Sequence, residues 1–492
     1  MPITLKGTLI MINFTGNIFI LGCGSIAQCS LPLLLNHLEI NPANITVMDF
    51  IDNRARISKE LAKGVRYVQK RFTKENYKEL LNQYLKSGDI FIDLSWNVST
   101  LSLIDWCHHH NVLFVNSAVE EWSNPSLDSD PRTRTLYIRQ MALNALSKSW
   151  ESRGPTAIID HGANPGLVSH LTKQALVDIA EHFLKNKALD PRSFSITAAL
   201  KTSDFSQLAY LLGVKTIHIS ERDTQVTNQP KKVGEFVNTW SVAGLIEEGL
   251  APAEMGWGTH EKRLPIGGLR YTEGPCNQIC LSQKGAKTWV QSWVPSGPIT
   301  GMVIRHGEAF SISNYLTIWK NGEVIYRPTV HYAYCPCDGA MDSLRELEMK
   351  HYVSQENFRI LNDEITYGVD ELGCLLMGHD FDAWWIGSVL DIEESRKLVP
   401  HQSATTVQVA ISLVAAALYA INHPNEGFCQ PDDLDYKEIL SFTKPYLGKF
   451  LSMPVDWSPL DYFKEINEYG QKIPSFEDKW QFTTFLLPPQ IE

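Results

Sequence analysis

A short apolar stretch that runs directly into a glycine turn places the strongest constraint on the fold. Residues 17–21 are Asn-Ile-Phe-Ile-Leu, which is typical of a buried strand, and Gly22, Gly24 and Ala27 follow at once. In this spacing the first glycine permits a tight turn, the second lets a pyrophosphate approach the backbone, and the alanine lets the next helix lie against the strand. The sequence therefore predicts a dinucleotide-binding strand–turn–helix unit.

The helix and strand that follow specify the dinucleotide further. A helix is expected over residues 25–38, and its first amides, on Ser25 and Ile26, point at the phosphates. Residues 45–49 form a second apolar strand that ends in Asp49. A carboxylate at this position accepts hydrogen bonds from both hydroxyls of the adenosine ribose and repels a 2′-phosphate. Asp49 therefore favours NAD over NADP.

Strand and helix patterns continue to alternate through the first third of the chain. Strands are expected at residues 65–68, 89–94 and 112–116, with a helix over 74–85 between the first two. This alternation predicts a parallel, doubly wound sheet. Ligands bind beyond the carboxyl ends of such strands, so polar side chains there fall near the cofactor, with a structural role in a turn as the alternative. These side chains are Asp93, Ser95, Asn97 and Ser117.

A further strand, at residues 156–160, leads into the segment His-Gly-Ala-Asn-Pro-Gly and then into a helix over 167–184. Asn164 is expected at the strand-to-helix turn, close to the place of a nicotinamide. Pro165 and Gly166 fit the first turn of the helix. Asn164 could also cap the helix, and the two roles are compatible.

The middle of the chain combines acidic and aromatic residues. Between residues 184 and 381 the pattern changes to shorter strands, loops and many aromatics, which predicts an α+β domain. A cation between an aromatic face and carboxylates gains roughly 0.5–2 kcal/mol from the ring and about 1.5–3 kcal/mol from each charged hydrogen bond. The sequence leaves open whether the acids converge on such a site or lie on the surface. The acid-bearing or aromatic segments are 221–225, 238–241, 247–250, 253–258, 306–308 and 370–373.

The length and charge of the chain limit the remaining choices. Its 492 residues exceed the roughly 250–300 that one core supports, so more than one domain is expected. We expect residues 1–165 to bind the dinucleotide, 166–392 to bind substrate and dimerise, and 393–492 to return to the first domain through an apolar helix at 404–421. A net charge of −11 without a basic cluster argues against nucleic acid or anionic membrane as a partner.

Cysteine usage and one interrupted apolar stretch bear on the compartment. Nine cysteines without a paired spacing predict reduced thiols in a cytoplasmic protein. The apolar stretch over residues 8–21 is too short and too polar to cross a bilayer. His331, Cys335 and Cys337 lack the second pair of ligands that a structural zinc site needs, so no metal is expected.

Motifs spread over the whole chain carry a family resemblance. They are the glycine turn and residues 119–120, 162–166, 213–215, 217–219, 221–225, 236–242, 256–259, 326–329, 331–334, 369–373, 435–436 and 445–448. In these motifs the sequence resembles the bacterial homospermidine synthases, relatives of the saccharopine dehydrogenases. The resemblance implies an α/β protein, with a Rossmann-type doubly wound parallel sheet plus an α+β substrate-binding and dimerisation domain. It also implies a homodimer with bound NAD.

The same resemblance implies the site residues. Trp240 would hold a cationic intermediate against its indole face, and Glu221 and Glu248 would anchor the distal ammonium of the diamine. Glu120, Asn164 and Asp370 would surround the reacting nitrogen. Carboxylates and His306 would be available for proton transfer, and which of them is the base stays open. The implied cofactor contacts are Gly22, Gly24, Ser25, Ile26, Ala27, Asp49, Ser95, Ser117 and Asn164. The chain departs from the family pattern at Asp93 and Ser403, where asparagine is expected.

The implied reaction transfers an aminobutyl group from putrescine or spermidine to putrescine. It releases ammonia and forms homospermidine without net redox. One alternative is an oxidoreductase of the saccharopine or carboxynorspermidine type, whose substrate carboxylate would require paired arginines, with Arg222, Arg305 and Arg327 as candidates. Another alternative is an NAD-binding sensor or scaffold without catalysis.

Overall fold

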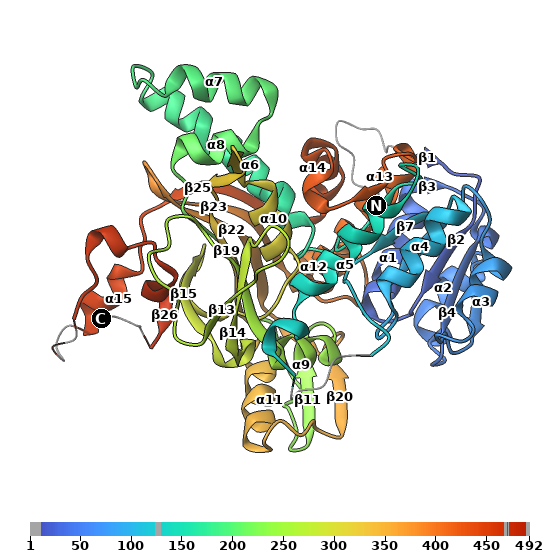
Figure 1. Cartoon of the computed structure of the whole chain (residues 1–492). Helices are drawn as coiled ribbons and strands as arrows, with labels where there is room; N and C mark the ends of the chain where they lie inside the picture. The colour runs from blue at the N-terminus through green and yellow to red at the C-terminus, as the bar shows by residue number, and fades with distance from the viewer. Residues whose placement is uncertain (1–10, 124–128, 467–469, 471, 489–492) are drawn as a thin grey trace.

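Two β-sheets organise the chain in the computed structural model, which describes residues 11–123, 129–466, 470 and 472–488. In Figure 1 the N-terminal sheet and its helices lie on the right, and the second sheet fills the centre and left of the molecule. Helices α5 (Leu136–Ser149) and α12 (Ile392–Leu398) lie between them in this view. The site described below is formed where the two parts meet.

The N-terminal sheet contains seven strands among the described residues, in the order β24-β8-β7-β6-β2-β4-β5, and its neighbouring strands are parallel. Helices α1 (Ser25–His37), α3 (Tyr77–Tyr84) and α4 (Thr100–His110) connect its strands. The order reverses at β2, which pairs with β4 on one side and β6 on the other, and such a reversal opens a ligand crevice. The predicted doubly wound sheet is confirmed. The strands are β2 Ile18–Leu21, β4 Ile45–Asp49, β5 Arg66–Gln69, β6 Ile90–Asp93, β7 Leu113–Asn116, β8 Ala157–Ile158 and β24 Phe428–Cys429.

The glycine turn follows β2 as the spacing predicts. Gly22 has φ +92°, and a Cβ atom there would lie 2.6 Å from the carbonyl oxygen of Leu94, so only glycine fits. A Cβ atom on Gly24 would meet no atom within 4 Å. The turn is held by the Cys23 amide, which donates to Asp49 Oδ2 over 2.7 Å. The backbone beside Gly24 thus faces open space at the start of α1.

The second sheet is mixed and has eleven strands in the described part of the chain. Strand β9 (Thr216–Asp223) is central, with β19 (Thr329–Cys335) parallel on one side and β22 (Val369–His379) antiparallel on the other. The main path is β13-β14-β12-β19-β9-β22-β23-β25. The other strands are β12 Pro252–Gly256, β13 Gly268–Arg270, β14 Gln278–Lys284, β15 Trp289–Val294, β16 Gly297–Met302, β23 Asp382–Asp391, β25 Lys449–Val455 and β26 Leu486–Leu487.

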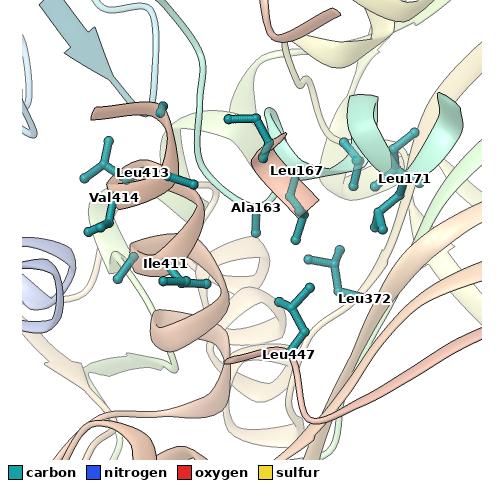
Figure 2. Close-up of a cluster of buried hydrophobic side chains, with 14 of the residues drawn as sticks. Ala163, Leu167, Leu171, Leu372, Ile411, Leu413, Val414 and Leu447 are labelled. Atoms are coloured by element: carbon teal, nitrogen blue, oxygen red, sulfur yellow. The ribbon is translucent and has the colours of Figure 1, made fainter. Parts of the chain in front are cut away.

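Two long helices join the sheets into one hydrophobic core. Helix α6 (Leu167–Asn186) packs on β22 and β23, and α13 (Ala404–Asn422) packs on α1, β7 and β22. Figure 2 shows side chains of α13, α6 and β22, among them Ile411, Leu167 and Leu372, in one buried hydrophobic cluster. Among the described residues α13 is the one helix long and apolar enough to cross a membrane, but 89% of its apolar window is buried in the fold. Near the end of the chain, α13 thus packs against α1 and β7 of the N-terminal part.

The predicted start of α6 at residue 167 is confirmed, but Pro165 and Gly166 lie before the first turn of the helix and not in it. The helix begins at Leu167, and Gly166 is its N-cap with φ +122°, outside the helical region. The amide of Gly162 donates to the carbonyl of Pro165 over 2.7 Å, so residues 162–166 close into a loop before the helix. Asn164 therefore does not cap the helix, and its amide nitrogen is instead 3.1 Å from Glu221 Oε2.

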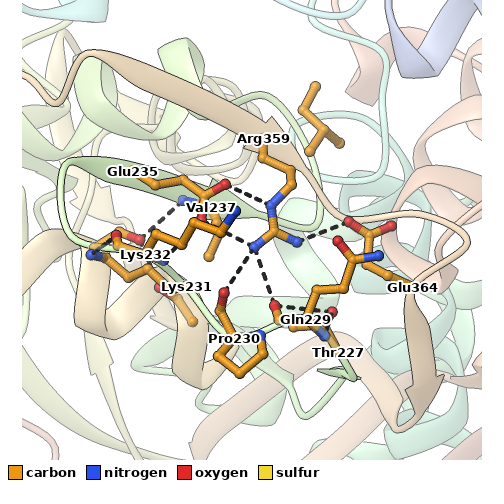
Figure 3. A network of polar contacts seen from close by, with 12 residues as sticks. Thr227, Gln229, Pro230, Lys231, Lys232, Glu235, Val237, Arg359 and Glu364 are labelled. Carbon is orange, nitrogen blue, oxygen red and sulfur yellow. Dashed lines mark hydrogen bonds and ion pairs between the residues drawn. The ribbon is translucent and has the colours of Figure 1, made fainter.

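A small lobe carries the segment that leads to Trp240. Strand β11 (Glu235–Asn238) pairs in parallel with β20 (Asn357–Ile360), next to α11 (Asp338–Met349), at the bottom of Figure 1. The guanidinium of Arg359 donates to both oxygens of Glu235, over 2.8 and 3.1 Å, and to Glu364 over 3.0 Å (Figure 3). Because Trp240 follows β11 after one residue, this network fixes the base of its loop.

The glycine turn gives the first testable prediction. We expect Gly22→Ala to lower the free energy of unfolding by at least about 2 kcal/mol, because the left-handed backbone and the overlap with the Leu94 carbonyl both oppose a side chain. Gly24→Ala is the matched control and should change it by less than about 1 kcal/mol. Urea denaturation measures both values, and equal losses would contradict the assignment.

Candidate functional site

A cavity of about 210 Å³ lies between the two sheets, at the carboxyl ends of β6, β7 and β8. Its carboxylates outnumber its cationic side chains: among the described residues, six carboxylates face two guanidinium groups and one imidazole. The carboxylates are Asp93, Glu120, Asp160, Glu221, Glu247 and Glu248, and the cationic groups are Arg139, Arg305 and His306. Such a lining favours a cationic ligand.

The structure brings most of the expected diamine-binding residues to this cavity. Its lining includes Glu120, Asn164, Glu221, Trp240, Glu248 and His306. Asp370, on β22, is fully buried and lies behind the lining. The hydroxyl of Thr405, which does line the cavity, donates to Asp370 Oδ2, whereas Oδ1 of Asp370 has no hydrogen-bond partner among the described residues. Asp370 thus reaches the cavity through Thr405.

The expected cofactor contacts divide into two groups. Ile26, Ser95, Ser117 and Asn164 line the cavity. Gly22, Gly24, Ser25 and Ala27 form the glycine turn and the first turn of α1, beside the open space at Gly24. Asp49 lies at the end of β4, outside the cavity lining, and accepts from the amides of Cys23 and Ile51 over 2.7 and 3.0 Å. Together these residues fit a dinucleotide whose pyrophosphate crosses the glycine turn.

Glu221 is held by two neighbours from different elements. Its Oε2 accepts a hydrogen bond from the hydroxyl of Tyr332 on β19 and one from Asn164 over 3.1 Å. Burial raises the pKa of Glu221, the Tyr332 hydrogen bond opposes this rise, and the nearby Asp223 adds to it. Asp370 lies near both of these acids, and burial followed by their charges raises its pKa well above the usual range. This corner is a cluster of three buried acids.

Trp240 forms the aromatic wall of the cavity. It lies between β11 and α9 (Val242–Leu250), and its indole Nε1 donates to the hydroxyl of Tyr334 over 2.9 Å. Thr239, the preceding residue, donates to Asp223 over 2.5 Å. The indole is therefore fixed both at its ring nitrogen and through its neighbour in the chain.

His306 lies between two further acids of the site. His306 Nε2 lies 3.1 Å from Glu248 Oε2, and its Nδ1 lies 3.4 Å from Glu308 Oε1. Burial by itself lowers the pKa of His306, but Glu308 and Glu248 together outweigh it and raise that pKa well above the usual range. Burial raises the pKa of Glu248, and the His306 charge opposes the rise. The imidazole is thus held between two carboxylates, whose charges favour its protonated form.

The two arginines of the lining are already paired. The Arg305 guanidinium forms an ion pair with Glu247, which also lies 3.4 Å from Arg139 Nη2. Arg139 Nη1 lies 3.8 Å from Glu120 and donates to the carbonyl of Val119 over 2.7 Å. The guanidinium groups therefore meet protein carboxylates, which weakens the case for a substrate carboxylate. The other candidates for that role, Arg222 and Arg327, are absent from the described lining of this cavity.

Several residues of the site were missed at the sequence level. Asp160 lines the cavity two residues beyond the end of β8 and accepts from Gln140 over 2.7 Å. Arg139 is on α5, where nothing in the sequence sets it apart from a solvated helix residue. Tyr332 and Tyr334 were noted only as part of a family motif. The two-residue spacing of these tyrosines on one strand was a usable signal, because it places both on the same face of the sheet.

Comparison with protein families assigns the class. Residues 18–158 match the saccharopine dehydrogenase NADP binding domain, and residues 162–453 match the saccharopine dehydrogenase C-terminal domain. With the cavity at the reversal of the parallel sheet, these matches define a dinucleotide-dependent enzyme of the saccharopine dehydrogenase class.

Individual relatives narrow the assignment. The chain is 39% identical over 489 residues to the homospermidine synthase of Mesorhizobium japonicum, and 38% identical over 482 residues to that of Blastochloris viridis; each comparison covers 96% of this chain and 97% of the relative. The structure of the homospermidine synthase of Legionella pneumophila in complex with NAD matches with a TM-score of 0.84 and 36% identity, over 97% of this chain and 99% of that chain. The chain belongs to the homospermidine synthase family.

The buried acids predict how stability depends on pH. Burial raises the pKa of Asp93, Glu120 and Asp160 to about 7 each. An acid with a raised pKa in the folded state stabilises the fold below its unfolded pKa, near 4, and this stability is lost as pH rises through 7. Buried histidines with lowered pKa act in the opposite sense, but only below about pH 6.5. The melting temperature of the ligand-free protein should therefore fall between pH 6.5 and 8.

Glu120→Gln provides the control for this prediction. The variant lacks the ionisation and should show a shallower fall, with a difference from the wild type of up to about 1 kcal/mol across the window. Putrescine, a dication, should restore the melting temperature of the wild type most strongly at pH 8. Parallel pH profiles for the two proteins would contradict the burial of an ionisable Glu120.

Proposed function

We propose that the protein joins two putrescine molecules into homospermidine and ammonia, using NAD as a retained prosthetic group. The observation that carries the proposal is the cavity at the reversal of the parallel sheet, where an indole and uncompensated buried carboxylates face each other. The family membership supports the same conclusion, as does the complex of the Legionella pneumophila relative with NAD. Paired arginines, which the amino-acid oxidoreductase alternative would need, are engaged by Glu247 and Glu120.

The diamine is proposed to span the cavity from the acid cluster to the nicotinamide. Glu221 and Glu248 bind the distal ammonium, Trp240 lies along the alkyl chain, and Asn164 and Glu120 lie near the reacting nitrogen. Because both ends of the diamine are bound, the site selects diamines by the distance between their two nitrogens. A diamine shorter or longer than putrescine leaves one buried carboxylate without its cation, which costs free energy.

When bound, NAD supplies the hydride acceptor for the amine-bearing carbon of putrescine and returns the hydride in the last step. The positive charge on the resulting imine is stabilised by the indole of Trp240. The amine of the second putrescine adds to the imine carbon, ammonia leaves, and the new imine is reduced. Two putrescines thus give one homospermidine and one ammonia.

Two features of the site serve the proton transfers and the exclusion of water. Glu120 and Asp160, with pKa raised to about 7 by burial, are suited to exchange a proton with an amine near neutral pH. Burial of the lining limits the access of water, which would otherwise hydrolyse the imine to an aldehyde.

The proposal extends to the domains, the compartment and the partners of the protein. Residues 1–165 bind NAD, residues 166–392 bind substrate and form the homodimer, and residues 393–492 return to the first domain. The protein acts in the cytoplasm, in keeping with its nine free thiols. Spermidine is proposed as an alternative donor of the aminobutyl group, and neither nucleic acid nor membrane as a partner.

Product analysis tests the overall reaction. Purified protein with NAD and isotope-labelled putrescine should form labelled homospermidine and ammonia in equal amounts, without accumulation of NADH. Mass spectrometry measures the polyamine, and absorbance at the nicotinamide band measures NADH. Formation of NADH in proportion to the putrescine consumed would instead indicate a simple amine oxidation and contradict the transfer.

A pair of variants separates the diamine site from the cofactor site. Trp240→Ala removes the cation–π surface and should lower kcat roughly 10- to 100-fold, while the affinity for NAD changes less than about twofold. Asp49→Ala should mainly weaken NAD binding, because its carboxylate lies at the turn and outside the cavity lining. Calorimetric titration with NAD and steady-state kinetics measure both effects. Equal loss of NAD affinity in the two variants would contradict the assignment.

A further inference from the structure

Two stacked tyrosines on β19 connect the acidic and aromatic halves of the cavity. Tyr332 and Tyr334 are two residues apart on one strand, both are buried, and their rings lie 5.1 Å apart at an interplanar angle of 11°. The ring of Tyr332 also lies 4.3 Å from the ring of His306. The tyrosine pair therefore contacts three residues of the site, Glu221, Trp240 and His306.

The chemistry of each hydroxyl fixes its direction. The Tyr332 hydroxyl donates to Glu221 Oε2, because a carboxylate only accepts. The Tyr334 hydroxyl accepts from Trp240 Nε1 over 2.9 Å, because an indole nitrogen only donates. Tyr334 on β19 pairs with Glu221 on β9 in the sheet. The strand pairing therefore also fixes the tyrosine pair relative to Glu221.

We propose that Tyr332 and Tyr334 are positioning residues of this site. Tyr332 fixes the Glu221 carboxylate and Tyr334 fixes the Trp240 indole, so that the two halves of the cation site keep their separation and orientation. The inference rests on the proposed function, since it assigns how that function's anchor and aromatic wall are held. Neither tyrosine needs to touch the diamine for this role.

The charges around Glu221 make its pKa sensitive to the Tyr332 hydrogen bond, so a pH profile can measure the loss of that bond. Asp223 on β9 and Asp370 on β22 oppose its ionisation, whereas His306 favours it. On β19, Tyr332 and Tyr334 are the neighbours, with raised pKa values, and the nearby Cys335 thiol has a raised pKa too. Tyr332, His306 and Asn164 lower the pKa of Glu221, so loss of the Tyr332 phenol raises that pKa further.

Tyr332→Phe tests the first half of the proposal. It keeps the ring and removes the donor, so the acidic limb of the pH profile of kcat/KM for putrescine should move up by about one pH unit. In a Glu221→Gln background the same change should leave the limb in place, since the partner is gone. Tyr326→Phe is the matched control: its hydroxyl donates to the carbonyl of Val214, outside the cavity lining, and its profile should equal that of the wild type.

Tyr334→Phe tests the second half. Without an acceptor for the indole nitrogen, Trp240 is held less firmly, and kcat should fall roughly 3- to 10-fold with less than about a twofold change in KM. Trp240→Phe lacks that nitrogen, so adding Tyr334→Phe to it should cause no further fall. An additive fall would mean that Tyr334 acts by another route and would overturn this assignment.

The outcomes separate the proposal from the function on which it rests. A wild-type protein that forms no homospermidine contradicts the proposed function and this inference together. An active wild type with an unmoved acidic limb in Tyr332→Phe contradicts the inference alone. Should Tyr332→Phe not fold, 3-fluorotyrosine at position 332 keeps the shape and donates more strongly. The limb should then move to lower pH, and an unmoved limb overturns the proposal.

Discussion

The burial of more negative than positive charge in one cavity is the constraint on which the site depends. A carboxylate taken out of water costs several kcal/mol unless a cation or hydrogen bonds compensate it. Here six carboxylates share two guanidinium groups and one imidazole among the described lining residues. Burial raises the pKa of several of these acids, and a dicationic ligand would compensate their charge. Affinity for a diamine and the tendency of the free site to bind protons have the same physical origin.

The cavity exists because two sheets of different kinds share one core. Helix α13, from the end of the chain, fills the space between α1, β7 and β22, and α6 begins at the loop that carries Asn164. The nucleotide sheet ends at the cavity on one side, and β9 with β19 forms it on the other. Movement of either sheet would change the distance between the glycine turn and the acid cluster. Because both sheets pack on the same core, that distance is fixed.

Local patterns predicted the nucleotide domain well and the second half of the site only in part. The turn at Gly22 and Gly24 depends on a few neighbouring residues. The long apolar run of α13 predicts a buried helix whatever it packs against. The loop at 162–166 was misjudged because a hydrogen bond between Gly162 and Pro165 sets its geometry, and propensity does not report such a bond. Whether the acids converge is decided by strand pairing between β9, β19 and β22, which residues alone do not specify.

The acids that line the cavity are of two kinds, those paired with an arginine and those without such a partner. Glu247 and Glu120 meet Arg305 and Arg139, two of the cations that line the cavity, so their charges are largely compensated before any ligand binds. Among the described residues, Glu248 pairs with an imidazole that it shares with Glu308, and the hydrogen-bond donors to Glu221 are neutral, Tyr332 and Asn164. The uncompensated charge is thus concentrated on the acids beside Trp240. A ligand ammonium gains most there, which gives a flexible diamine a defined orientation in an otherwise acidic cavity.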